Sequence, residues 1–84
     1  MKVKGTVSAI YPLKEFPNCA SNQQVELTLS DGEKIMLQFF NKAYLLKKHY
    51  VKIGDKLSVE YRTVCKKYNQ TEYVNNYVLW MNVK

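Results

Sequence analysis

Apolar and polar residues alternate along the first segment of the chain. Val3, Gly5, Val7 and Ala9 occupy one set of positions, and lysine, threonine and serine occupy the positions between them. Because successive side chains of a strand point to opposite faces, this period of two predicts a half-buried strand over residues 2–10. A glycine inside such a strand indicates a bend or bulge, as the corner of a barrel requires.

The clearest pattern surrounds the dipeptide Asp31-Gly32. Val25, Leu27 and Leu29 alternate with polar residues before it, and a second alternating segment follows it. Asp-Gly between two alternating segments is the strongest short-range signal for a β-hairpin. The pattern therefore predicts two paired strands. The non-core face of the returning strand carries Lys34, Met36, Gln38 and Phe40.

The alternation stops at Asn41, which is a good helix N-cap residue. Residues 42–50 lack β-branched side chains, and lysines gather toward their end, where the helix dipole favours positive charge. Leu45, Leu46 and His49 can share one helical face. This segment predicts a short helix between residues 41 and 50.

Two more strands are predicted in the last third of the chain. Leu57, Val59 and Tyr61 alternate with polar residues, and the polar stretch over residues 66–70 predicts a hairpin loop. The final strand spans residues 72–83, and its core-facing set stays open between two alternatives. These are Tyr77, Leu79 and Met81, or Val74, Val78 and Trp80.

The predicted order is three strands, a short helix and two further strands, which we expect to pair antiparallel. This order matches an all-β OB-fold, a five-stranded Greek-key barrel with a helix between strands three and four. The main alternative, an SH3-like barrel, does not usually place a helix there. Because 84 residues suffice for one domain and are too few for two, we expect residues 1–84 to form a single OB-fold domain.

Three segments carry a resemblance to a known family: residues 3–7, residues 51–59, and residues 69–73 leading to Leu79-Trp80. In these segments, and over nearly its whole length, the chain resembles small stand-alone OB-fold proteins of bacteria and phages that are similar to single-stranded-DNA-binding proteins. The resemblance implies a partner of single-stranded DNA, or RNA, in replication, recombination or repair. Bacterial members usually carry a tail with an acidic tip, whereas this chain ends in Met81-Asn82-Val83-Lys84, so recruitment through such a tail is not expected.

The charge of the chain is unevenly distributed. The formal net charge is +6, and residues 42–84 hold all of this excess, because basic and acidic residues cancel over residues 1–41. Such an imbalance favours a polyanionic partner. The alternative is a soluble protein whose isoelectric point is simply basic.

Several function classes lack the residues they need. The two cysteines are far apart and are expected to be reduced thiols, and with a single histidine the chain has no zinc-ligand set. No catalytic pairing of a nucleophile with a base and no glycine-rich phosphate loop occurs, so we expect no enzyme activity, no cofactor and no small-molecule substrate. No apolar segment is long enough for a membrane span or a secretion signal, which predicts a cytoplasmic protein.

Sequence-tolerant binding of single strands needs a positive groove and aromatic faces on which bases stack. On OB-folds the ligand surface is the outer face of strands two and three with the loops that flank it. Phe39 and Phe40 are neighbours in one strand, so they point to opposite sides, and Phe40 is the ring available for stacking. The predicted nucleic-acid-binding residues are Lys14, Phe16, Lys34, Gln38, Phe40, Arg62, Lys66, Lys67 and Tyr68.

Two hypotheses for function follow. In the first, the protein binds single-stranded DNA, or RNA, without sequence preference. In the second, it is a protein-interaction or oligomerisation module with no nucleic-acid role, and its charge only aids solubility. OB-folds serve both purposes. The exposed sheet edges and Phe40 favour a homo-oligomer under either hypothesis.

Overall fold

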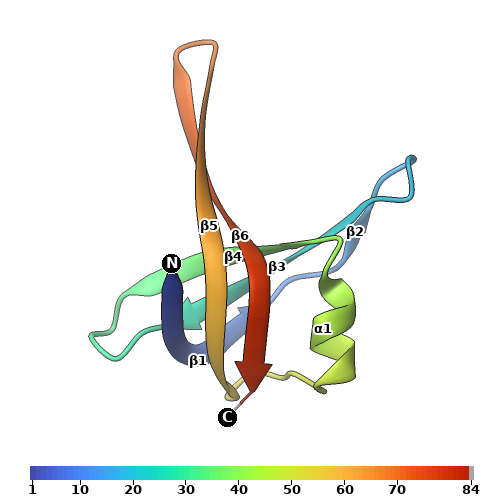
Figure 1. The fold of residues 1–84 in the computed structure, drawn as a ribbon. Coiled ribbons are helices and arrows are strands. Elements are labelled where there is room, and N and C mark those ends of the chain that lie inside the picture. Colours follow the sequence, from blue (N-terminus) through green and yellow to red (C-terminus); the bar gives the residue numbers. More distant parts are fainter. Residues whose placement is uncertain (84) are drawn as a thin grey trace.

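The computed structural model describes residues 1–83 and shows a strongly curved, β-rich fold with one short helix (Figure 1). The OB-fold prediction is confirmed, with the helix between the third and fourth long strands. A two-residue strand, β2, lies inside the loop that was expected after the first strand. The elements are β1 (Lys2–Ile10), β2 (Lys14–Glu15), β3 (Ser21–Thr28), β4 (Lys34–Phe40), α1 (Ala43–Lys48), β5 (Lys56–Tyr68) and β6 (Thr71–Val83).

The strand pairings form a closed ring in the order β1, β3, β4, β6 and β5, with β5 returning to β1. The pairing of β4 with β6, through Gln38 and Tyr77, is parallel, whereas the sequence had predicted an antiparallel arrangement throughout. Closure of the barrel accounts for this one parallel pairing. The last strand has to fill the gap between β4 and β5, and its direction is already set by its antiparallel hairpin with β5.

Strand β1 pairs with two neighbours in succession, and Gly5 lies where it passes from one to the other. Thr6 pairs with Lys56 of β5 and also with Thr28 of β3. A Cβ atom at Gly5 would lie 2.9 Å from the carbonyl oxygen of Thr28, so this close approach of two backbones requires glycine. The irregularity was predicted at Gly5, but the bulge of this strand lies three residues later, at Ser8.

The core fills the interior of the ring, and α1 covers one end of it. Leu45 and Leu46 of the helix are buried together with side chains from all five long strands. The helix begins after Lys42, so Asn41 is not its N-cap as predicted. Instead, the side chain of Asn41 accepts a hydrogen bond from the backbone N–H of Ser21 at 2.8 Å and ties the end of β4 to β3. Within residues 1–83, no helix has the length and apolar character to span a bilayer.

Strands β5 and β6 form a long hairpin that projects well beyond the barrel (Figure 1). The loop predicted over residues 66–70 is wrong, because both strands continue to a two-residue turn at Asn69-Gln70. Both turn residues have positive φ, 48° and 64°, which is typical of a type I′ turn. At the other end of the hairpin, Leu79 forms a bulge opposite the step from Glu60 to Tyr61.

The bulge at Leu79 answers the question of which residues of the last strand face the core. A regular strand would bury residues two apart, whereas the bulge adds one residue and shifts the alternation. Val78 and Met81 are therefore both buried, one from each of the two sets that competed in the sequence. Leu79 and Trp80 are both exposed, on the outside of the barrel.

Candidate nucleic-acid interface

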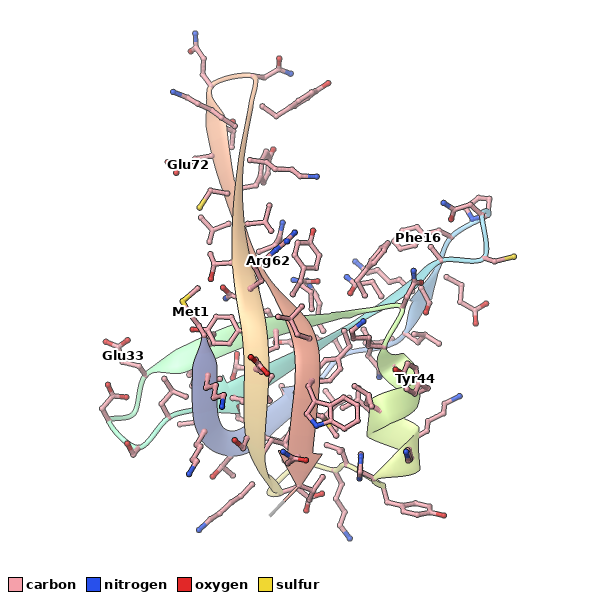
Figure 2. The ribbon with its side chains drawn as sticks, viewed as in Figure 1. Met1, Phe16, Glu33, Tyr44, Arg62 and Glu72 are labelled. Carbon is pink, nitrogen blue, oxygen red and sulfur yellow. The ribbon has the colours of Figure 1, made fainter. Side chains whose placement is uncertain are left out.

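Two projections flank the outer face of β3 and β4: the β5–β6 hairpin, and an arm formed by β2 and the turn that leads into β3 (Figure 1). Figure 2 shows Arg62 at the base of the hairpin and Phe16 on the β2 arm. The hairpin base is fixed to β4, because the side-chain amide of Asn76 donates a hydrogen bond to the carbonyl oxygen of Met36 at 3.1 Å. The hydroxyl of Thr63 in turn donates to the Asn76 oxygen at 2.8 Å.

An aromatic row, which we define as Phe16, Phe40 and Tyr77, joins the two projections. The rings of Phe40 and Tyr77 meet edge to face, with centroids 6.3 Å apart and an interplanar angle of 83°. Phe40 and Phe16 line a shared surface pocket of about 430 Å³. Each of these phenylalanines is 43% exposed, so their rings remain accessible to a ligand.

Cations stand at both ends of the aromatic row. Arg62 lies directly opposite Tyr77 across the β5–β6 hairpin and therefore on the same face of it. At the other end, Lys14 pairs with Asn22, and Asn22 pairs with Phe40, which places Lys14 on the same side of the sheet as that ring. The predicted residues Lys14, Phe16, Phe40 and Arg62 are thus brought to one surface.

The hairpin has two chemically different faces. In its register, residues directly opposite each other share a face, and successive residues alternate between faces. One face continues outward from Arg62 and Tyr77 and contains no acidic residue among those the structure describes. We call it the basic face. It consists of Arg62, Val64, Lys66, Tyr68, Thr71, Tyr73, Asn75 and Tyr77.

The register separates the two lysines that the sequence had predicted to act together. Lys66 lies on the basic face, opposite Tyr73. Lys67 lies on the other face, directly opposite the carboxylate-bearing Glu72. Only Lys66 therefore adds its charge to the surface that carries the aromatic row.

Two other predicted residues are placed less favourably than the alternation suggested. Gln38 is only 6% exposed, because β6 pairs alongside it and its side-chain oxygen accepts a hydrogen bond from the Asn22 amide at 2.7 Å. Lys34 is exposed but lies 3.7 Å from the carboxylate of Glu26, which compensates its charge. Of the residues predicted on the open face of β4, Phe40 is accessible to a ligand, whereas Gln38 is buried and hydrogen-bonded to Asn22.

Tyr77, Tyr73 and Asn22 belong to this surface and were not among the predicted site residues. Tyr77 was considered only as a candidate for the core. Tyr77 lies opposite Arg62 because both strands continue to the turn at Asn69-Gln70. A loop over residues 66–70, as the sequence predicts, does not give this pairing.

Comparison with known proteins supports the fold. No protein-family model and no curated protein sequence matches this chain. Among solved structures, the chain is similar to the mitochondrial single-stranded DNA binding protein Rim1 of S. cerevisiae, with a TM-score of 0.73 and 13% sequence identity. The alignment covers 99% of this chain and 91% of that one. At this identity the similarity shows a shared fold, and the site has to be argued from this chain's own residues.

Proposed function

We propose that the protein binds single-stranded DNA, or RNA, without sequence preference, along the surface that carries the aromatic row. The observation that supports this most directly is the continuous placement of Arg62, Tyr77, Phe40 and Phe16 between the two projections. Cations that follow a phosphate backbone beside rings on which bases stack are the two elements of sequence-tolerant single-strand binding.

The same arrangement discriminates against a duplex. Bases in a double helix are stacked on one another and do not present their faces to a protein, whereas bases of a single strand are free to stack on Phe40 or Phe16. Arg62, Lys66 and Lys14 would contact phosphates, which carry no sequence information. The similarity of the fold to that of a single-stranded DNA binding protein agrees with this proposal.

Phe40→Ala tests the proposal. Its ring is partly exposed and contacts Tyr77, so truncation removes a stacking surface and leaves the core unchanged. Base–aromatic stacking is typically worth about 1–3 kcal/mol per base, which corresponds to a roughly 5- to 150-fold loss of affinity for oligo-dT. Fluorescence anisotropy of a labelled oligo-dT, with a duplex of equal length in parallel, measures this change.

Tyr50→Ala is the matched control, because Tyr50 is an aromatic residue that is 86% exposed beyond the end of α1. The pocket that it lines is formed with residues such as Leu46 and Val51 and includes no member of the aromatic row. We expect it to bind oligo-dT as the wild type does. Equal affinities of the wild type for oligo-dT and for duplex DNA, or an unaltered affinity in Phe40→Ala, would contradict the proposal.

A second candidate function is a homo-oligomer interface, favoured by the side-by-side exposure of Leu79 and Trp80 at 48% and 47%. These residues lie on the outer face of the barrel, and Trp80 lines a pocket with Lys2 and Asn82, none of which belongs to the aromatic row. Under this alternative, Trp80→Ala would dissociate an oligomer in analytical ultracentrifugation, and the wild type would have no measurable affinity for oligo-dT.

A further inference from the structure

Another pocket lies on the barrel, outside both the aromatic row and the surface around Trp80. It has a volume of about 520 Å³ and is formed where β1, the beginning of β5 and the end of β3 meet. Its polar lining residues are Lys4, Thr6, Thr28, Ser30 and Lys56. Neither the aromatic row nor the basic face of the hairpin contributes to it.

The polar residues around this pocket are of the kinds that bind a phosphate group. Two lysines and three hydroxyl-bearing residues surround it together with Leu29 and Leu57, and none of the described lining residues is acidic. The acidic residues next to it in the chain have their carboxylates engaged within their own turns. Asp31 accepts a hydrogen bond from the backbone N–H of Glu33 at 3.0 Å, and Asp55 accepts one from that of Lys52 at 2.9 Å.

The strand register connects this pocket to the outer face of β3 and β4. Lys56 pairs with Thr6, Thr6 with Thr28, and Thr28 with Lys34, so these residues form one row across four strands. Lys4 lies on the same face of β1 as Thr6, two residues away. Phe40 is six residues along β4 from Lys34, a distance of roughly 20 Å, and the row adds about 14 Å across three strand spacings.

The intervening surface does not repel a polyanion. Glu26 is the acidic residue on this face of β3, and its carboxylate lies 3.7 Å from the Lys34 ammonium and accepts a hydrogen bond from the Ser8 hydroxyl at 2.9 Å. Its charge is therefore compensated where a strand would pass.

We propose that this pocket is a second phosphate-binding subsite, reached by a nucleic-acid strand that leaves the aromatic row and crosses β4, β3 and β1. This inference rests on the proposed function and specifies the path of the same ligand. A short oligonucleotide occupies the aromatic row alone. A longer one gains additional contacts to Lys4 and Lys56.

The test compares oligo-dT lengths from about 4 to 20 nucleotides, which span the site sizes known for OB-folds. The variant Lys4→Gln/Lys56→Gln removes both ammonium groups and leaves polar, uncharged side chains that are one bond shorter. We expect its affinity for the shortest bound oligonucleotide to equal that of the wild type. For the longest one, the log–log salt dependence should be shallower by about 1.4, since each lost contact to a single strand removes about 0.7.

Lys47→Gln/Lys48→Gln is the matched control, because it removes the same charge from exposed positions of α1. It should bind every length as the wild type does. A Lys4→Gln/Lys56→Gln variant that matches the wild type on long strands, or that loses affinity equally at all lengths, would overturn the second subsite while the proposed function stands. Absence of wild-type binding to oligo-dT of any length would remove the proposed function and the subsite together.

Discussion

Lys66 and Lys67 are neighbours with the same charge, but the hairpin register predicts different roles for them. Lys66 lies on the basic face with Arg62 and Tyr77, whereas Lys67 lies on the opposite face across from Glu72. If the basic face contacts the phosphates of a bound strand, Lys66→Ala should weaken binding and Lys67→Ala should not. Neither side chain is buried, so neither change should affect the fold.

The expected magnitude follows from counterion release. Each phosphate contact to a single strand contributes about 0.7 to the slope of log affinity against log salt concentration. Lys66→Ala should therefore flatten the slope by about 0.7, and the difference corresponds to a factor of roughly 2.6 between 50 and 200 mM salt. Lys67→Ala should leave the slope unchanged, and the double variant should equal Lys66→Ala alone.

Fluorescence anisotropy of labelled oligo-dT over a salt series, with the three variants measured beside the wild type, resolves this difference. Lys67→Ala serves as the control for net charge, because it removes the same unit of charge from the adjacent position. Equal slopes for both single variants, or a double variant that is shallower by about 1.4, would show that the face on which a lysine lies does not matter, and would refute the reasoning from register.

Two further predictions concern the backbone of the fold. Gln70→Gly should relieve the positive φ of 64° at the hairpin turn, a conformation that costs a non-glycine residue about 1 kcal/mol or more. Amide hydrogen exchange in the outer hairpin should then slow roughly fivefold, and unaltered exchange would show that the turn is not strained. Gly5→Ala should lower the free energy of unfolding by about 1–3 kcal/mol, because the added Cβ would lie 2.9 Å from the Thr28 carbonyl oxygen. Urea unfolding should show a lower midpoint with an unchanged m-value, and a midpoint equal to that of the wild type would contradict this close approach.

Part of the candidate interface could be predicted from residue types and alternation, whereas the parts that depend on pairing between distant strands could not. Phe40 was correctly placed outside the core because its neighbour Phe39 completes the apolar face of β4. Gln38 follows the same alternation but is buried, because β6 pairs beside it, and that pairing joins segments far apart in the chain. Tyr77 was missed for a related reason, since its partner Phe40 comes from another strand.

The amino-acid sequence alone was sufficient for the element order, for the turn at Asp31-Gly32 and for the interruption by a short helix. These features depend on local φ/ψ preferences and on side-chain periodicity, which neighbouring residues set among themselves. The tertiary structure decided two further features: the alternation of β6 past Leu79, and the fact that residues 66–68 belong to a strand, in which Lys67 lies opposite Glu72. Both depend on the hydrogen-bond register between β5 and β6. A bulge or an extended hairpin changes that register by a single residue, and a single residue moves every following side chain to the other face.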